Sequence, residues 1–414
     1  MPKLRFPEFE QSWEEIPLGE LGQFFRGLTY GADDVASEGL LVLRSSNIQG
    51  GQLVLDSDLV FVTKRCPPEM CLKRGDIAIC MSNGSKALVG KSGEFHNDYP
   101  GELTVGAFCS IFRPKKPFAK IAFSTPRYEN FVATGIAGGN INNLKNSDLE
   151  SFVFHVPPTN EEQQKIADCL SSLDELIAAQ ARKVEALKTH KKGLMQQLFP
   201  REGETQPRLR FPEFHGTTGW TMGKIENLAK RGSGHTPSKS VPEYYGGGVK
   251  WVSLADSKRL DTGFISETET NISELGIKNS SAVLHPAGTV LISRDAGVGK
   301  SAVMAVPMAV SQHFIVWVCD NQKLRNWFLY YLLQFMKPIF ERIATGSTIK
   351  TIGLPFFKEL SIAVPSVSEQ QRIADCLAFL DTLINTATQE LETLKIHKKG
   401  LMQQLFPSVE AIEA

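Results

Sequence analysis

The sequence contains two copies of one plan, and this duplication restricts the possible fold more than any other feature. Residues 2–9 read PKLRFPEF, and residues 207–214 read PRLRFPEF. Two further matches share an offset of 207 residues: IADCL at 166–170 and 373–377, and HKKGLMQQLFP at 190–200 and 397–407. Because this period is far longer than that of a solenoid repeat, it indicates two homologous halves rather than a repeat array.

The repeated stretches at the end of each half have the pattern of long helices. Thr159 with Glu162, and Ser366 with Glu369, have the spacing of an N-terminal capping box. Apolar residues then alternate at spacings of four and three over about five heptads, which favours a coiled coil over a generic amphipathic helix. Neither helix can bury this seam alone, so we expect the two helices to pair. The predicted seam residues are Ile166, Leu170, Leu173, Ile177, Val184, Leu187, Leu194, Leu198, Ile373, Leu377, Leu380, Ile384, Leu391, Leu394, Leu401 and Leu405.

The segments that differ between the halves, about residues 10–156 and 215–364, are β-rich. They contain short runs of strand-forming residues that glycine and turn residues interrupt. The predicted strands lie within 40–48, 75–82, 108–114, 249–254, 288–293 and 313–318, and helices are expected near 118–134 and 322–344. This pattern predicts a mixed α+β domain in each half, with a curved sheet or partial barrel and a few helices.

The charge is balanced over the chain but not along it. The sequence has 45 Lys and Arg residues and 45 Asp and Glu residues, yet residues 207–363 carry 18 basic against 12 acidic residues. This local excess of positive charge indicates a polyanionic partner only weakly. If that partner is DNA, other subunits must supply much of the phosphate neutralisation.

Cysteines and apolar runs point to a reduced cytoplasmic protein. The seven cysteines are scattered and form no C-x-x-C pair, which argues against a zinc ribbon or a disulfide framework. No apolar run reaches the length of about 18 residues that a membrane span needs. The N-terminal sequence lacks the apolar core of a signal peptide.

One stretch imitates a phosphate-binding loop. Residues 297–301 read GVGKS, but the full pattern needs a glycine where this chain has Arg294, and 89–92 (VGKS) lack the spacing as well. We interpret both as a tight hairpin turn that is duplicated with the halves and presents Lys91 and Lys300 on a common face, which suits a phosphate contact. The chain has no H-x-x-x-H pair, no G-x-S-x-G and no Asp/Asn-Pro-Pro-Tyr/Phe stretch, so no metal cluster, nucleophile elbow or amino-methyltransferase site is indicated.

A duplicated pair of variable domains, each followed by a long helix, resembles the specificity subunit of type I restriction-modification enzymes. The resemblance covers essentially the whole chain. It rests on the LRFPEF openings, the helix starts EEQQKIADCLSSLDELI and SEQQRIADCLAFLDTLI, the KKGLMQQLFP ends, and RGSGHTPSKSVPEYYGGGVKWVSLAD at 231–256. It implies two tandem α/β target-recognition domains and an antiparallel coiled coil with pseudo-two-fold symmetry. The expected boundaries are 1–158 and 201–365 for the domains, 159–200 and 366–407 for the helices, and 408–414 for a tail.

The resemblance also implies a function. Each domain is expected to read one half of a bipartite, asymmetric sequence in double-stranded DNA. The coiled coil is expected to set the unread spacer and to dock two modification subunits, which bind S-adenosylmethionine and methylate adenine. Restriction subunits with an ATP-driven motor and a Mg²⁺-dependent nuclease complete the complex. The chain itself is then expected to be non-catalytic and to hold no cofactor and no metal.

Candidate DNA contacts are polar loop residues, because Arg, Lys, Asn, Gln and small hydroxyls are the side chains that bind base edges and phosphates. For each of them, a role in a turn or on the solvated surface is the alternative. In the first half the candidates are Arg26, Thr29, Tyr30, Arg44, Ser45, Ser46, Asn47, Asn83, Ser85, Lys86, Lys91, Asn140 and Asn142. In the second half they are Ser233, His235, Thr236, Ser238, Lys239, Trp251, Ser253, Arg294, Lys300, Gln312, Ser347, Thr348 and Lys350.

Two other functional classes stay open at this point. A coiled-coil scaffold could organise partners without binding DNA, although the basic second half argues weakly against this. A self-contained nuclease or methyltransferase is disfavoured by the missing motifs and by a length taken up entirely by two repeats.

Overall fold

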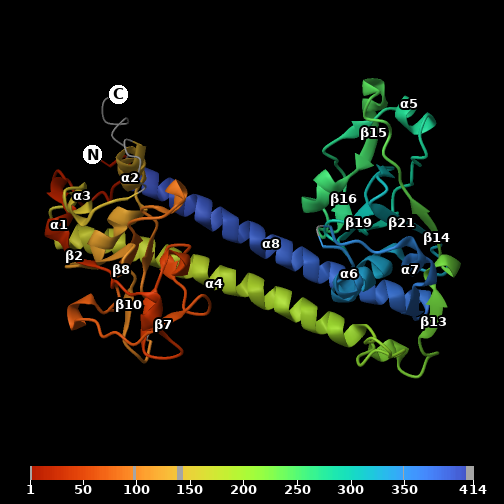
Figure 1. Ribbon diagram of the computed structural model, residues 1–414, viewed down its shortest axis with the longest axis horizontal. Coiled ribbons are helices and arrows are strands. Elements are labelled where there is room, and N and C mark those ends of the chain that lie inside the picture. Colours follow the sequence, from red (N-terminus) through yellow and green to blue (C-terminus); the bar gives the residue numbers. More distant parts are fainter. Residues whose placement is uncertain (1, 97–98, 138–142, 348, 407–414) are drawn as a thin grey trace. The chain divides into compact units, whose positions relative to one another are not determined.

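The protein is described here by a computed structural model, which places residues 2–96, 99–137, 143–347 and 349–406. The chain divides into two compact units. Unit 1 comprises Met1–Ala181 and Gln389–Ala414, and unit 2 comprises Arg182–Thr388. Each unit therefore contains one β-rich domain and part of each long helix (Figure 1). The division cuts through the helices because each domain packs on one portion of both.

The two long helices form where the sequence predicts them. Helix α4 spans Asn160–Leu198 and helix α8 spans Val367–Leu405. The hydroxyls of Thr159 and Ser366 accept hydrogen bonds from the backbone N–H groups of Glu162 and Glu369, both at 3.3 Å. Half of each predicted capping box is thus present. The prediction of the other half is wrong, because the carboxylates of Glu162 and Glu369 do not accept the backbone N–H groups of Thr159 and Ser366.

The helices pair in antiparallel fashion within unit 1. Asp174 of α4 forms an ion pair with Lys398 of α8. Further along α4, Gln180 donates a hydrogen bond to Glu390 at 2.8 Å. Residue numbers rise along α4 while those of its contacts in α8 fall, which only antiparallel helices allow.

The same pairing occurs within unit 2. There Lys191 of α4 forms an ion pair with Asp381 of α8, the two residues that correspond to Lys398 and Asp174 by the 207-residue offset. Leu198 and Leu377 share one hydrophobic core. All predicted seam residues of both helices are buried or half-buried.

The described residues of the unit 1 domain form three sheets. Their strands, in spatial order, are β1 (Glu14–Pro17) and β12 (Val153–Val156); β10 (Leu103–Val105), β4 (Leu40–Leu43), β7 (Val60–Val62) and β3 (Val35–Ala36); and β2 (Gly22–Arg26), β11 (Cys109–Pro114), β8 (Ile77–Cys80), β9 (Ser92–Glu94), β6 (Gln52–Leu53) and β5 (Ile48–Gln49). Its short helices are α1 (Leu18–Leu21), α2 (Pro126–Ala137) and α3 (Asn146–Glu150).

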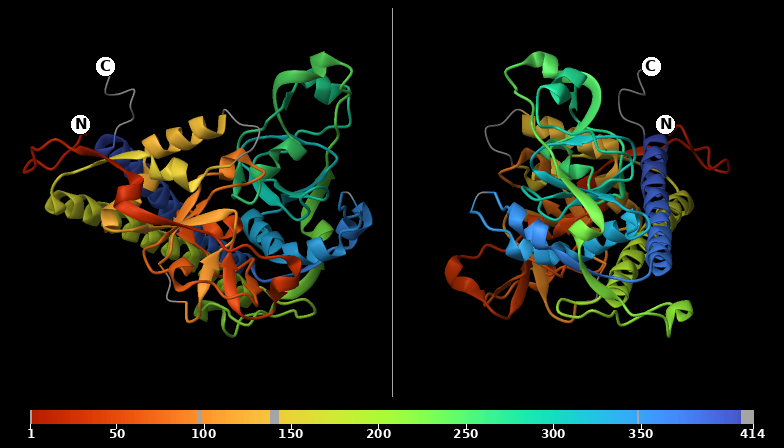
Figure 2. Two further views of the ribbon diagram at one scale, coloured as in Figure 1. Left: turned by 60° about the vertical axis from the view of Figure 1, so that its left-hand side comes forward. Right: turned by 90° about the vertical axis from the view of Figure 1, so that its right-hand side faces the viewer.

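In unit 2, the part of the domain that the structure describes also forms three sheets. Their strands are β13 (Thr221–Lys224) and β22 (Ser361–Val364); β14 (Ala229–Ser233), β21 (Phe314–Cys319), β18 (Val290–Ser293), β19 (Ser301–Met304) and β16 (Phe264–Ile265); and β17 (Asn271–Ile272), β15 (Tyr245–Val252) and β20 (Ala309–Val310). Its helices are α5 (Glu274–Lys278), α6 (Asn326–Ile343) and α7 (Leu354–Glu359). Helix α6 contacts β18 and β19 (Figure 2), and its apolar side chains join the core that includes α8.

The two domains share one topology, as the duplication predicts. In each, the first and last strands pair antiparallel, β1 with β12 and β13 with β22. In each, a central strand lies between two antiparallel neighbours: β11 between β2 and β8, and β21 between β14 and β18. A parallel pair also recurs, β4 with β10 and β15 with β20. The predicted strands and the helix near 322–344 are confirmed, whereas the stretch near 118–134 begins as a 3₁₀ helix (Pro117–Ser124) before α2.

Candidate nucleic-acid interface

Three predicted loops of unit 1 meet where β2, β4 and β8 end. The backbone N–H of Leu28, just after β2, donates to the carbonyl of Val105 at 2.7 Å, and Val105 belongs to the strand that pairs with β4. The side-chain amide of Asn83, after β8, donates to the hydroxyl of Ser45, after β4, at 3.1 Å. The structure therefore brings together loops that lie far apart in the sequence.

The predicted contacts of unit 1 differ in exposure. The exposed ones are Arg26, Thr29, Ser46, Ser85 and Lys86, the half-buried ones are Tyr30, Arg44, Ser45, Asn83 and Lys91, and Asn47 is buried. Asn140 and Asn142 lie outside the described residues.

Three residues of the loop after β4 form bonds within the domain itself. Asn47 is 1% exposed; its side chain accepts the N–H of Arg44 at 2.9 Å and donates to the carbonyl of Ser57 at 3.0 Å. Its burial removes Asn47 from the proposed contacts, since it shapes the loop instead. Arg44 forms an ion pair with Asp58, which also accepts the hydroxyl of Ser46 at 2.5 Å.

The predicted loops of unit 2 are joined in a similar way. The hydroxyl of Thr236, after β14, donates to the side-chain carbonyl of Gln312 at 2.5 Å. The guanidinium of Arg294, after β18, donates to the carbonyl of Ile352 at 3.0 Å. The loop that precedes Ile352 contains Ser347 and Lys350, so these residues lie on the same side of the domain as Arg294.

The predicted contacts of unit 2 also divide by exposure. The exposed ones are Ser233, His235, Ser238, Lys239, Gln312, Ser347 and Lys350, the half-buried ones are Thr236, Ser253, Arg294 and Lys300, and Trp251 is buried. Thr348 lies outside the described residues.

Three of these side chains have roles within the domain. Trp251 is 6% exposed and donates its indole N–H to the carbonyl of His235 at 3.1 Å, so it supports the loop after β14 rather than reaching solvent. Ser253 caps a 3₁₀ helix. Lys300 donates to the carbonyl of Ser257 at 3.0 Å. We therefore remove Trp251 from the proposed DNA contacts.

The stretches GVGKS and VGKS lie in hairpins, as interpreted from the sequence. β18 pairs antiparallel with β19, and β8 with β9, so a strand follows each stretch instead of the helix that a phosphate loop requires. Gly299 and Gly90 have φ values of +83° and +79°, a conformation that glycine adopts most easily. The connections contain more residues than a tight turn, so that detail of the prediction is wrong.

A glycine follows β2 and another follows β14, because in both domains another chain segment passes very close to that position. A Cβ atom at Gly27 would lie 2.0 Å from the carbonyl oxygen of Gly106, and one at Gly234 would lie 1.6 Å from that of Val310. Only glycine fits such an approach. This packing fixes the loops after β2 and β14 against the neighbouring sheet.

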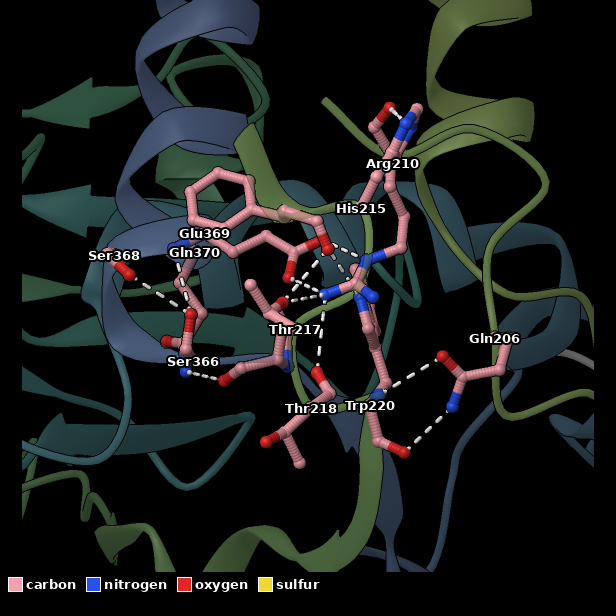
Figure 3. Close-up of polar contacts among 12 residues, drawn as sticks. Gln206, Arg210, His215, Thr217, Thr218, Trp220, Ser366, Ser368, Glu369 and Gln370 are labelled. Atoms are coloured by element: carbon pink, nitrogen blue, oxygen red, sulfur yellow. Dashed lines mark hydrogen bonds and ion pairs between the residues drawn. The ribbon is translucent and has the colours of Figure 1, made fainter. Parts of the chain in front are cut away.

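The repeated LRFPEF sequence forms an ion pair that the sequence did not reveal. In unit 2, Arg210 donates to both carboxylate oxygens of Glu369, at 2.8 and 2.6 Å, and Trp220 donates its indole N–H to the same carboxylate at 3.2 Å (Figure 3). Glu369 is 1% exposed. Hydrogen bonding to this carboxylate raises the pKa of Arg210 above its usual value.

Unit 1 contains the same arrangement. Arg5 donates to Glu162 at 2.7 and 2.8 Å, and Trp13 donates to Glu162 at 3.0 Å. We call Arg5, Trp13 and Glu162, and their counterparts Arg210, Trp220 and Glu369, the arginine clamps. Each clamp holds the start of one long helix.

The segment that carries each clamp also binds the end of the other long helix. The N–H of Leu4 donates to the carbonyl of Gln404 at 3.2 Å, and the N–H of Leu209 donates to that of Gln197 at 3.0 Å. In each unit, LRFPEF therefore ties the first turn of one helix to the last turn of its antiparallel partner.

A histidine packs against strand β14. His285 is 6% exposed, and its ring lies 2.8 Å from where a Cβ atom of Gly232 would be. Burial lowers the pKa of His285 below its ordinary value of 6.5. The folded protein therefore favours the neutral ring.

Within the described ranges, no group of three or more His, Cys, Asp or Glu residues is arranged to hold a metal ion. None of the helices in those ranges is long and apolar enough to cross a membrane.

Comparison with known proteins identifies relatives over most of the chain. The family described as type I restriction modification DNA specificity domain matches residues 78–189 and 217–395. The type I restriction enzyme StySPI specificity subunit of Salmonella potsdam is 26% identical over 432 residues, which cover 96% of this chain and 89% of that protein. The MjaIX specificity subunit of Methanocaldococcus jannaschii is 32% identical over 193 residues, 46% of this chain and 44% of that protein.

A solved structure supports the fold. The S subunit of a type I restriction-modification system from M. genitalium is 16% identical, with a TM-score of 0.58 over 99% of this chain and 100% of that chain. At this identity the likeness concerns the fold alone.

Proposed function

Because the chain belongs to the type I restriction modification DNA specificity family, we propose that it reads the DNA target of a type I restriction-modification complex. Each β-rich domain reads one half of a split, asymmetric sequence in double-stranded DNA. Methylation and cleavage belong to modification and restriction subunits in the cytoplasm. S-adenosylmethionine, ATP and Mg²⁺ bind those subunits and not this chain.

The observation that carries this proposal is a duplicated scaffold with different residues at equivalent loop positions. Arg26 ends β2 opposite Ser110, the second residue of β11, and Ser233 ends β14 opposite Ile315, the second residue of β21. Arginine and serine offer different hydrogen bonds at the same place in two similar domains. Two domains of one topology can approach DNA alike, and different loops then select different half-sites.

Electrostatics fits a chain that binds DNA together with partners. Residues 207–363 carry 18 basic and 12 acidic residues, whereas residues 1–155 carry 16 basic and 18 acidic residues. Phosphate contacts by Lys and Arg supply most of the salt-dependent affinity for DNA. This chain therefore contributes sequence selection, and two modification subunits contribute much of the non-specific affinity.

We assign the docking of the modification subunits to exposed apolar residues on the long helices. Phe379 is 63% exposed and Leu383 is 37% exposed, and they lie one turn apart on α8. Leu176, at the equivalent of Leu383 on α4, is 57% exposed. Coiled-coil side chains that are apolar but outside the seam are typical of a surface that a partner covers.

The test is to map methylated adenines in a host that expresses this chain with its modification subunit. The expected result is one bipartite target. Replacing residues 215–364 with the corresponding segment of another specificity subunit should change only one half of that target. Changes in both halves would contradict independent reading, and no retention of DNA by the assembled complex would favour a scaffold.

A second experiment tests the role of the helices. Inserting one heptad at equivalent positions of α4 and α8 keeps the seam in register and adds about 10 Å at 1.5 Å per residue. This corresponds to about three base pairs at about 3.4 Å per step. The spacer should lengthen while both half-sites stay unchanged, and an unchanged spacer would disprove the ruler role.

A further inference from the structure

Each domain has a four-residue turn immediately before its central strand. In unit 1 the N–H of Cys109 donates to the carbonyl of Gly106 at 2.8 Å, and in unit 2 the N–H of Phe314 donates to that of Ser311 at 3.2 Å. The two turns occupy equivalent places, because Cys109 and Phe314 are the first residues of β11 and β21. None of the candidate contacts chosen from the sequence lies at the third position of either turn.

The backbone at this third position is fixed in both domains. The carbonyl of Phe108 accepts the N–H groups of Met81 and Ser82 at 2.8 and 3.2 Å, and the carbonyl of His313 accepts that of Arg294 at 2.9 Å. Met81 and Arg294 directly follow the equivalent strands β8 and β18. These backbone hydrogen bonds to the sheet therefore fix the main-chain position of residues 108 and 313, independently of which side chain each residue carries.

In unit 1 this fixed position carries an apolar side chain. Phe108 is 71% exposed. A single exposed apolar residue needs no explanation on its own. Phe108, however, follows the turn residue Gly106, against which Gly27 packs, and its carbonyl binds the segment that leads to Asn83. The backbone of Phe108 is thus fixed beside the loops of Arg26 and Asn83, and most of its ring is exposed to solvent.

In unit 2 the same position carries an oriented imidazole. The Nδ1 atom of His313 lies 2.7 Å from the carboxylate of Asp295, which is 9% exposed. A carboxylate oxygen accepts hydrogen bonds, so Nδ1 is the ring atom that donates to Asp295, and in the tautomer with its proton on Nδ1 the Nε2 atom is an acceptor. Nε2 lies 3.5 Å from the side-chain nitrogen of Gln312, whose carbonyl accepts the hydroxyl of Thr236. The acceptor is therefore placed next to two candidate contacts.

We propose that Phe108 and His313 are specificity-determining residues for the two half-sites. Phe108 contacts the methyl group of a thymine in the major groove, and Nε2 of His313 accepts a hydrogen bond from the exocyclic amino group of adenine or cytosine. Both are groups that the major groove displays and that distinguish base pairs. This inference rests on the proposed function, since it assigns base contacts within that same interface.

Variants can separate these roles from folding. Phe108→Ala removes an exposed ring and should leave thermal unfolding unchanged. In His313→Asn, the amide nitrogen replaces Nδ1 and preserves the bond to Asp295, while Nε2 is lost. Phe264→Ala is the control, because Phe264 is 54% exposed but lies in the edge strand β16, where it packs on Trp327.

The experiment measures binding of the complex with its modification subunit to duplexes in which each target position is changed in turn. Phe108→Ala should weaken binding about 5- to 100-fold through one half-site only, and His313→Asn should do so through the other. Replacing one thymine of the first half-site with uracil, which lacks the methyl group, should weaken the wild type several-fold and leave Phe108→Ala unaffected. Phe264→Ala should behave like the wild type.

Several results would overturn the inference. The inference fails if both variants bind DNA as tightly as the wild type. It also fails if a variant loses affinity equally through both half-sites, or loses as much affinity for non-specific DNA as for the target. A loss for Phe108→Ala with no thymine-to-uracil effect would also overturn the thymine assignment, as a ring that wedges between base pairs would behave in this way. If the wild-type complex itself shows no bipartite preference, the proposed function fails first.

Discussion

The arginine clamp of unit 2 makes a quantitative prediction about stability. Arg210 is the partner of a carboxylate that is 1% exposed, and it binds both oxygens of that carboxylate. Removing one partner of a buried pair leaves an uncompensated charge, which costs about 3–5 kcal/mol of unfolding free energy. Arg210→Ala should therefore destabilise unit 2 by about that amount.

An exposed ion pair in the same unit provides the control. Arg342 binds both oxygens of Glu202, but these side chains are 62% and 61% exposed. Exposed pairs contribute about 0–1 kcal/mol, so Arg342→Ala should have little effect. Urea denaturation followed by tryptophan fluorescence measures the difference, since four of the five tryptophans (220, 251, 317 and 327) belong to unit 2.

A second substitution tests the cause of the loss. Adding Glu369→Gln to Arg210→Ala removes the buried charge, so the double variant should regain part of the lost stability. If Arg210→Ala costs no more than Arg342→Ala, or if the double variant is the less stable of the two, the uncompensated charge is not what destabilises the unit.

Three other perturbations have clear expected outcomes. Burial lowers the pKa of His285, so the stability that its neutral ring supports should be complete above about pH 6.5 and lost as the pH falls toward the lower folded-state pKa. Between pH 7.5 and pH 5 the urea midpoint of unfolding should therefore fall less in His285→Leu than in the wild type. Parallel curves for the two proteins would reject burial of His285 as the cause. Gly234→Ala places a Cβ atom 1.6 Å from a carbonyl oxygen and should lower the free energy of unfolding by about 1–3 kcal/mol or more. Gly248→Ala, where a Cβ atom would have no atom within 4 Å, should lower it by less than about 1 kcal/mol in the same denaturation assay. Phe379→Ala should weaken co-purification of the modification subunit about tenfold or more while Phe264→Ala does not; equal recovery of the subunit with both variants would move the docking surface elsewhere.

The sequence predicts what local pattern and duplication determine. Helix α4 begins at Asn160 and α8 at Val367, each one residue after its predicted cap. The strands within 75–82 and 288–293 have the apolar run of a buried strand, and both are found. Strand order does not follow from local pattern, because it depends on pairings such as β10 with β4, whose partners lie about 60 residues apart.

Candidate contacts are less predictable, since exposure of a loop residue depends on distant neighbours. Asn47 and Ser46 are adjacent and both polar, yet one shapes the loop through Ser57 and the other is exposed. Glu162 has the sequence of a capping residue, but Arg5, 157 residues away, attracts its carboxylate. Phe108 was missed because it opens the run at 108–114 that the sequence predicts as a strand, where an aromatic residue usually indicates core, and only the folded structure shows that it is exposed.

Pairing of the first and last strands has a consequence for how such a gene can change. β1 pairs with β12 and β13 pairs with β22, so the chain enters and leaves each domain at adjacent points. A foreign cassette with matching end strands can therefore be inserted without altering the helices on either side. The stretches on either side of each variable segment are nearly identical in the two halves, so such an exchange would join the same residues at both ends. Exchange of one cassette would therefore renew one domain and leave both helices and the other domain as they are.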